Sequence, residues 1–269
     1  MHIDTLLHSV KQQFKLSNRD INLSVTSSWA QGRTLYGGVS AALVYQAMRE
    51  AVADDNVLRS LNTNFIAPIE SDCEFNINVE VLRQGKNVTQ VIGRLIQNNQ
   101  VAVMSQASFG VARQSSIQIT SNLQHTMDYP QRSNVMPPPL KLAPSFLKHF
   151  NLIPTKGGLP FYGLKEGDVH GWMRFNQPPS DFTDAHLVAL IDIWPPTVLQ
   201  MLKVPAMAST MSWNLEFIHP HQKIAGEDWF AYQAQTRQAV DGYAHTEANI
   251  WDKHGELVAI SRQVVAVFA

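Results

Sequence analysis

The sequence lacks the features of cross-linked, membrane-spanning and polyanion-binding proteins. Its one cysteine, Cys73, cannot form an intramolecular disulfide, which excludes a disulfide-stabilised scaffold. The apolar run at residues 187–191 stops at Asp192, and it is far shorter than the roughly 20 residues that cross a bilayer. Lys and Arg number 21 and Asp and Glu number 22, so the net charge offers no attraction for nucleic acid. We therefore expect no membrane span and no nucleic-acid partner.

The composition is that of a globular chain with a substantial core. Of 269 residues, 45% are hydrophobic and 16% are charged, and this length suits one large domain or two ordinary ones. The amino-terminal segment has no apolar stretch typical of a secretory signal peptide, and the lone cysteine agrees with a reducing compartment. The sequence therefore predicts a cytoplasmic protein.

The first half of the chain has one helical pattern followed by several strand patterns. Residues 37–52 begin with a glycine pair. The residues after the pair place apolar side chains at helical spacing, which predicts an apolar helix. Strand-like runs follow at 61–66, 73–81, 88–92 and 101–104. Because apolar and polar residues alternate from Phe75 to Val81, we expect an antiparallel sheet with one face against the helix.

The same order returns in the second half, which indicates an internal duplication. The segment Asn64-Phe-Ile-Ala-Pro68 is similar to Glu216-Phe-Ile-His-Pro220 in the second half. The second set of elements is predicted as a strand at 168–175, an apolar helix at 185–202 and strands at 211–218, 229–236, 244–251 and 257–268. We therefore predict a first repeat at 1–112, a Ser/Gln- and Pro-rich connecting segment at 113–159, and a second repeat at 160–269 that carries the catalytic residues.

Asp192 is the most informative single position. It is the one carboxylate between Leu187 and Trp194, and an unpaired charge on an apolar helix is costly to bury. Pro195 and Pro196 follow, and because proline lacks an N–H, the helix should kink or end there. A carboxylate beside freed backbone groups in apolar surroundings is a candidate general base. The competing interpretation is a structural aspartate that is hydrogen-bonded to a neighbouring strand.

Thr210 and Gln263 are two further candidate polar residues. Thr210 begins the strand after the second predicted helix, and its hydroxyl can both donate and accept hydrogen bonds. Gln263 lies among aliphatic residues in the last strand, where its amide could orient a water or a carbonyl group. Each of them alone has an ordinary structural interpretation in a strand.

Other motifs give weaker support to competing chemistry. Ser40 lies in Gly-Val-Ser-Ala-Ala, which differs from the nucleophile-elbow pattern at its last position. His219 and His221 could project together as metal ligands, but a proline lies between them and no acidic or cysteine ligand is near in sequence. Gly37 and Gly38 form neither a Walker motif nor a dinucleotide fingerprint. We therefore predict no metal and no cofactor.

Several short motifs accompany the duplicated pattern. Leu35-Tyr-Gly-Gly opens the first predicted helix, and the first sheet contains Arg83-Gln-Gly-Lys-Asn-Val88, Ile96-Gln-Asn-Asn-Gln100 and Gln106-Ala-Ser-Phe109. Together with the two copies of a helix followed by a sheet, these motifs resemble those of the double-hotdog acyl-CoA thioesterases. The family counterparts are Phe-Gly-Gly-Gln, Arg-x-Gly-x-Ser-Phe, Ile-Gln-Asn-Gly-Lys and Thr-Ala-Ser-Phe. Asn87 stands where the family has serine.

The resemblance implies both a fold and a reaction. The fold is α+β, a double hotdog of two tandem repeats, each an antiparallel sheet wrapped around a long apolar helix. The family's catalytic Asp, Thr or Ser, and Gln correspond to Asp192, Thr210 and Gln263, which would hold and deprotonate a water that attacks an acyl-CoA thioester. Gly37 and Gly38 are the candidate substrate-binding residues, since N–H groups at a helix start can bind a developing oxyanion. A role in lipid metabolism follows.

Two other functions remain open at this point. A hotdog protein that binds an acyl thioester or a partner without catalysis would use the same three residues as structural hydrogen-bonding groups. A hydratase or dehydratase would need a histidine paired with an acid near a helix start, for which His186 and Asp184 are candidates. A homo-oligomer is also expected, because exposed sheet edges and apolar faces favour association.

Overall fold

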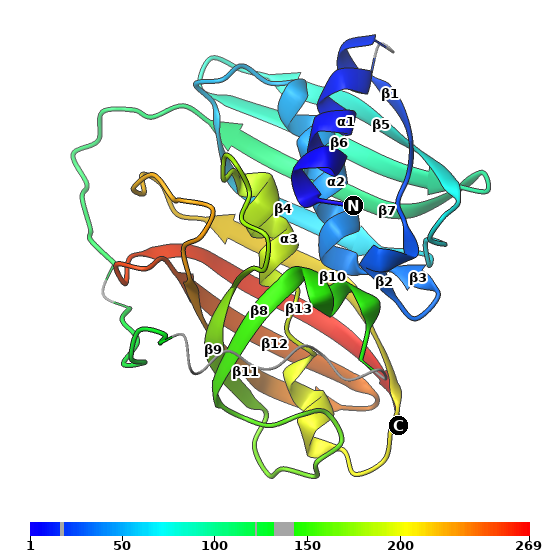
Figure 1. Ribbon diagram of the computed structural model, residues 1–269. Helices are drawn as coiled ribbons and strands as arrows, with labels where there is room; N and C mark the ends of the chain where they lie inside the picture. Colours follow the sequence, from blue (N-terminus) through cyan, green and yellow to red (C-terminus); the bar gives the residue numbers. More distant parts are fainter. Residues whose placement is uncertain (17–18, 122, 132–142) are drawn as a thin grey trace. The chain divides into compact units, whose positions relative to one another are not determined.

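The structure is a computed structural model that describes residues 1–16, 19–121, 123–131 and 143–269. The chain forms two compact units. The first contains Met1–Asn122, Pro144–Phe146 and Phe182–Ala189, and the second contains Leu123–Ala143, Leu147–Asp181 and Leu190–Ala269. Each unit is built on an antiparallel sheet (Figure 1).

The sheet of the first unit has the strand order β1-β5-β6-β7-β4. Its strands are β1 (Asp20–Ser24), β4 (Val57–Phe65), β5 (Glu74–Gln84), β6 (Val88–Gln97) and β7 (Gln100–Gly110). In β6 every second residue from Thr89 to Gln97 is buried, as expected when one face of a sheet packs on a core. A short 3-10 helix, η1 (Ser27–Trp29), precedes a separate ribbon of β2 (Ala30–Gln31) and β3 (Thr34–Leu35).

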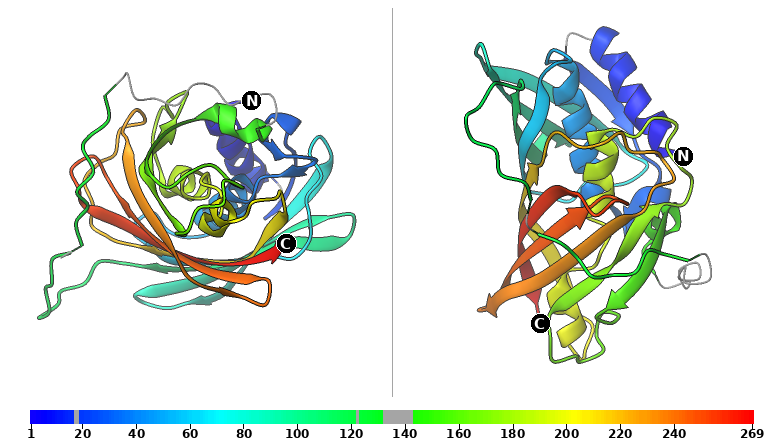
Figure 2. Two further views of the ribbon diagram at one scale, coloured as in Figure 1. Left: turned by 90° about the horizontal axis from the view of Figure 1, so that it is seen from below. Right: turned by 90° about the vertical axis from the view of Figure 1, so that its left-hand side faces the viewer.

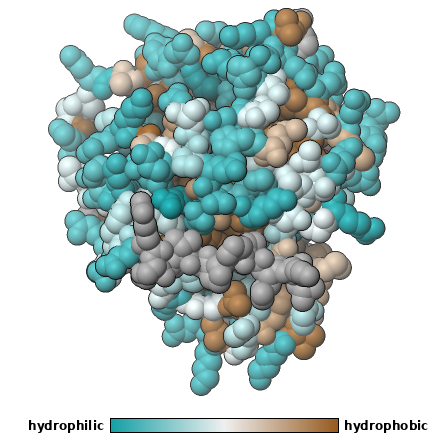
Figure 3. All heavy atoms as spheres, viewed as in Figure 1, coloured by the Kyte–Doolittle hydropathy of each residue, from teal (hydrophilic) through white to brown (hydrophobic). Residues whose placement is uncertain are grey.

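Two helices form layers on this sheet. α2 (Gly37–Glu50) packs on β5, β6 and β7, and a Cβ at Gly93 would lie 2.6 Å from a methyl of Val44, so glycine permits the close approach. α1 (Ile3–Leu16) packs against α2 and buries apolar residues at the helical spacing of Ile3, Leu6, Leu7 and Val10 (Figure 2). Its other side is polar, and the face drawn in Figure 3 is largely hydrophilic.

The sheet of the second unit has the strand order β10-β13-β12-β11-β9-β8. Its strands are β8 (Phe150–Lys156), β9 (Asp168–Phe175), β10 (Met207–Phe217), β11 (Phe230–Val240), β12 (Tyr243–Trp251) and β13 (Leu257–Phe268). The 3-10 helix η4 (Thr197–Met201) lies against β9 and β11, and η3 (Ser145–His149) leads into β8. Figure 2 shows the curvature of the sheet in each unit.

The second predicted helix is shorter than the sequence pattern suggested. α3 extends over Asp184–Ile191, not over 185–202, and η4 is a separate element. The helix ends early because Pro195 and Pro196 carry no N–H to continue the helical hydrogen bonds. Asp192 therefore lies in the turn that follows α3.

Several elements of the structure were not predicted from the sequence: α1, β1, the β2–β3 ribbon and β8. Among the described residues, no helix has both the length and the apolar character needed to cross a membrane.

Candidate active site

The turn after α3 presents the carboxylate of Asp192. The amide of Ile193 donates to the carbonyl of Leu190 over 3.4 Å, so the chain tightens as the helix ends. The neighbouring residues Ile191 and Ile193 are each 1% exposed, whereas Asp192 is half-buried. The turn therefore carries one polar side chain between two fully buried apolar ones.

A β-bulge brings Thr210 onto the face of the sheet that carries Gln263. β10 and β13 pair antiparallel, with Trp213 opposite Gln263 and Thr210 opposite Val265. The register shifts between Thr210 and Ser212, so one extra residue is accommodated in β10. Without that bulge, Met211 and not Thr210 would project beside Gln263, because side chains alternate along a strand.

Gln263 joins Thr210 and Asp192 into one hydrogen-bonded chain. The Thr210 hydroxyl donates to Oε1 of Gln263 over 3.2 Å, and Nε2 of Gln263 donates to Oδ1 of Asp192 over 2.9 Å. These partners fix the orientation of the amide, since only its nitrogen can donate to a carboxylate. The structure thus brings together all three predicted catalytic residues, from the turn after α3 and from two neighbouring strands, within the second unit.

An apolar row begins beside this polar chain. Val265, two residues after Gln263, forms a buried cluster with Val198 of η4 and Ala244 of β12, and Ala208 and Val267 pack against it. A carboxylate, a hydroxyl and an amide next to an apolar surface can hold a water and deprotonate it beside a hydrophobic ligand.

Two aromatic residues near Asp192 were not anticipated from the sequence. Trp194 follows Asp192 by two residues and stacks on Tyr232 of β11, with ring centroids 5.7 Å apart and an interplanar angle of 13°. Burial, and then the negative charge of Asp192, raise the pKa of Tyr232 far above its ordinary value. An aromatic residue in a strand is typical of a core, so its placement near the carboxylate emerges only in the folded chain.

Gly37 and Gly38 begin α2 in the first unit. A Cβ at Gly38 would lie 2.8 Å from Cε2 of Tyr36, so the missing side chain leaves space for the tyrosine ring. That ring also stacks on Phe146, with centroids 4.2 Å apart, and its hydroxyl donates to the carbonyl of Ala189 in the last turn of α3. The observed role of Gly38 is thus to accommodate Tyr36, and substrate binding by the two glycines stays a prediction.

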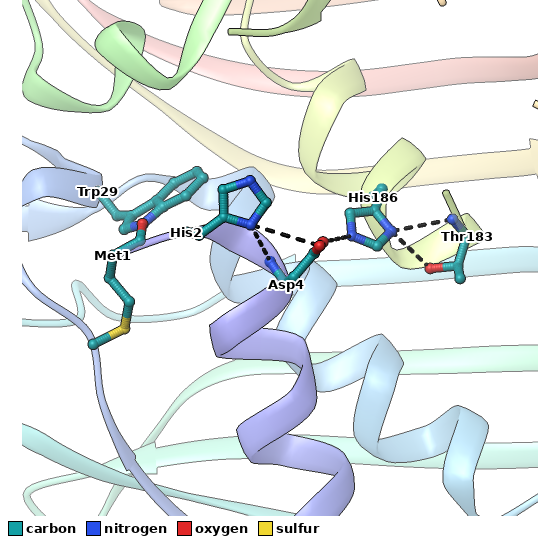
Figure 4. Close-up of polar contacts among 6 residues, drawn as sticks. All are labelled: Met1, His2, Asp4, Trp29, Thr183 and His186. Carbon is teal, nitrogen blue, oxygen red and sulfur yellow. Dashed lines mark hydrogen bonds and ion pairs between the residues drawn. The ribbon is translucent and has the colours of Figure 1, made fainter. Parts of the chain in front are cut away.

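The motifs considered for competing chemistry have local structural partners. The hydroxyl of Ser40 donates to the carbonyl of Gly37 within α2. His186 accepts the Thr183 amide at Nδ1 over 3.1 Å and contacts Asp4 of α1 through Nε2 over 3.0 Å (Figure 4). This is the geometry of a helix-capping histidine, with Asp4 and not Asp184 as its acidic partner. The rings of His219 and His221, the pair that the sequence did not favour as metal ligands, lie 4.7 Å apart.

The chain matches two family models in sequence order. Residues 25–110 match the acyl-CoA thioesterase N-terminal domain, and residues 130–267 match the acyl-CoA thioesterase C-terminal domain. A curated relative, acyl-CoA thioesterase 2 of Haemophilus influenzae, is 21% identical over 252 residues, with 86% of each chain covered.

Solved structures show the same architecture. A protein with a hot dog fold from Alicyclobacillus acidocaldarius is 21% identical, with 94% of each chain covered and a TM-score of 0.78. Acyl-CoA thioesterase II TesB2 from Mycobacterium marinum is 19% identical, with 94% of each chain covered and a TM-score of 0.70. These similarities confirm the α+β double-hotdog fold predicted from the sequence.

Proposed function

The chain belongs to the acyl-CoA thioesterase family, and from this premise we propose that it hydrolyses fatty acyl-CoA to free acid and CoA with Asp192 as the general base. The observation that carries the proposal is the pair of hydrogen bonds through Gln263, which links Asp192 and Thr210 although they are distant in sequence. A carboxylate joined to a hydroxyl and an amide can position and activate one water.

The proposed reaction needs no covalent enzyme intermediate. Asp192 takes a proton from the water as its oxygen forms a bond to the thioester carbonyl carbon, and the carbonyl π electrons move to oxygen. The tetrahedral intermediate then collapses, the carbon–sulfur bond breaks, and the thiolate leaves. The proton on Asp192 neutralises the thiolate, so the products are the carboxylic acid and CoA.

Each of the other residues has a defined part in this scheme. Gln263 holds the carboxylate of Asp192 in place, and its amide is held in turn by Thr210. The oxygen of Thr210 can accept a hydrogen bond from the attacking water while its own hydroxyl hydrogen points to Oε1 of Gln263. The apolar row of Val198, Ala208, Ala244, Val265 and Val267 is the proposed surface for the acyl chain. Backbone N–H groups at Gly37 and Gly38 are the proposed oxyanion donors.

Replacement of Thr210 by valine tests this scheme with little change in shape. The substitution removes the hydroxyl but keeps the branched side chain that suits the strand. We expect kcat for thiol release from acyl-CoA to fall by about 10- to 100-fold, with a smaller change in KM, because the water and Gln263 lose a partner. The matched control is Thr246→Val. Thr246 of β12 is the neighbour of Gln263 in the sheet register, and this variant should keep the activity of the wild type. Equal activity in the two variants would contradict the role given to Thr210.

Other sequence-based predictions accompany this function. The cytoplasmic location, the role in lipid metabolism, the homo-oligomer and the division at 113–159 remain predictions. Non-catalytic binding of an acyl thioester is the alternative function, and it would show as acyl-CoA binding without thiol release.

A further inference from the structure

The aromatic pair next to Asp192 lies on the catalytic face of the second sheet. Tyr232 pairs with Ile250, Ile250 pairs with Ala259, and Ala259 precedes Gln263 by four residues in β13. Because side chains alternate and no register shift interrupts these stretches, Tyr232 and Gln263 project from the same face. The turn with Asp192 and Trp194 lies against this face, since Asp192 contacts Gln263 and Trp194 contacts Tyr232.

The position of the Trp194 indole is tightly constrained. Gly171 of β9 pairs with Tyr232, and a Cβ at Gly171 would lie 2.6 Å from Cη2 of Trp194. The indole N–H is buried without a hydrogen-bond partner among the described residues, which is an unfavourable place for a polar atom. The stack thus sets the Tyr232 ring beside the Asp192 turn.

The Tyr232 hydroxyl has the properties of a fixed hydrogen-bond donor. Its burial and the charge of Asp192 raise its pKa, so the phenol keeps its proton at any physiological pH. The Tyr232 hydroxyl lies within the electrostatic field of Asp192, which is the second cause of this raised pKa. Such a phenol is too weak an acid to give up its proton to a thiolate but can stabilise a developing negative charge.

We propose that Tyr232 is a further catalytic residue, whose hydroxyl donates a hydrogen bond to the carbonyl oxygen of the thioester. The inference rests on the proposed function, because a water activated by Asp192 must attack a carbonyl carbon close to that carboxylate. The carbonyl oxygen is the strong acceptor at this reacting centre, and its negative charge grows as the water adds. Tyr232 keeps its own proton throughout, so the balance of the hydrolysis is unchanged.

A comparison of two ligands tests this hydrogen bond without turnover. Calorimetry would measure the binding of decanoyl-CoA and of S-decyl-CoA, a thioether that lacks the carbonyl group. Asp192→Asn would provide the background, and Tyr232→Phe would be added to it, since phenylalanine keeps the ring and its stack on Trp194. We expect the added change to weaken decanoyl-CoA binding by about 3- to 10-fold, as for one lost hydrogen bond, and to leave S-decyl-CoA binding unaltered.

Activity gives a second readout in the otherwise unmodified chain. We expect Tyr232→Phe to lower kcat for decanoyl-CoA by about 10-fold or more, whereas Tyr243→Phe at an exposed tyrosine of β12 should have no effect. Unaltered decanoyl-CoA affinity, or an equal loss for both ligands, would overturn the inference. Failure of the proposed function would appear differently, as undiminished thiol release by Asp192→Asn alone.

Discussion

Gln263 can serve both of its side-chain partners in only one orientation of its amide. Its oxygen accepts from Thr210, and its nitrogen donates to Asp192. A carboxylate in place of the amide could only accept hydrogen bonds. It would leave the Asp192 oxygen without this donor and would add a second negative charge beside it. The residue therefore connects the candidate base to the strand that carries the hydroxyl.

Gln263→Glu tests that connection directly. The new carboxylate would face Asp192 in place of an N–H, so we expect kcat to fall by about 10- to 100-fold while the protein stays folded. Steady-state thiol release would measure the loss, and circular dichroism would check the fold. The control is Gln106→Glu, which makes the same charge change at an exposed position of β7. A similar kcat in both variants would be incompatible with the role of Gln263.

Gly38 and Tyr36 provide a second test at this scale, on stability. Gly38→Ala places a Cβ 2.8 Å from Cε2 of Tyr36, so the ring must move from its stack on Phe146. We expect the free energy of unfolding to fall by about 1–3 kcal/mol, as in other overpacked sites. In a Tyr36→Leu background the same change should cost little or should stabilise, because alanine favours a helix over glycine by about 1 kcal/mol. Additive effects in urea denaturation would refute this coupling.

The residue types of the candidate site could be predicted from the sequence, but their geometry could not. Asp192 is recognisable as a lone carboxylate in an apolar run, and the family resemblance gave catalytic roles to Thr210 and Gln263, which alone have ordinary structural interpretations. The face of the sheet from which Thr210 projects depends on a bulge, and no residue type in β10 predicts that bulge. Tyr232 was missed because its proximity to Asp192 depends on the turn after α3.

At the level of elements, the boundaries follow from local chemistry wherever a strong signal exists. α2 begins at Gly37 as predicted, and the proline pair explains why α3 stops before it. β8 was missed because it contains Pro154, which disfavours a strand, but it is the last strand of its sheet, where proline is tolerated. The signal for α1 was present in the spacing of Ile3, Leu6, Leu7 and Val10.

The strap, residues 123–129, is an element whose attachment should depend on pH. The carbonyl of Leu123 accepts from Nε1 of Trp251, and the ring of His125 packs edge-on against Trp172 and Trp251. Burial lowers the pKa of His125. The detached strap therefore binds a proton more readily than the docked one, and docking is favoured above about pH 6.5 and weakened as pH falls through the pKa of the docked state.

Hydrogen exchange of the strap amides would measure this dependence. We expect protection of residues 123–129 to decrease as pH falls from 7 to 5, after correction for the intrinsic exchange rate. His125→Phe should remove the dependence while it keeps an aromatic ring at the position. His170→Phe is the control, because burial also lowers the pKa of His170, but that residue lies on β9. A strap whose protection stays constant with pH in the wild type would contradict the account.

At the scale of the whole molecule, the pattern of helix and strands predicted two repeats of a helix and an antiparallel sheet, and the family resemblance identified them as a double hotdog. Two compact units each contain an antiparallel sheet, and the family models match the chain in two consecutive stretches. The periodicity of apolar residues suffices for this level, because it records which face of each element is buried. Contacts between residues far apart in sequence, such as Asp192 and Gln263, produce no comparable pattern in the local sequence.

The most direct test of the central claim compares thiol release by the wild type and by Asp192→Asn. Asparagine keeps the shape of the side chain but cannot take a proton from water. Both proteins would be assayed with acyl-CoAs of increasing chain length at equal enzyme concentration. The account predicts turnover by the wild type and a loss of about 100-fold or more in kcat in the variant, with acyl-CoA binding retained. Comparable turnover by the two proteins would contradict the assignment of Asp192 as the general base.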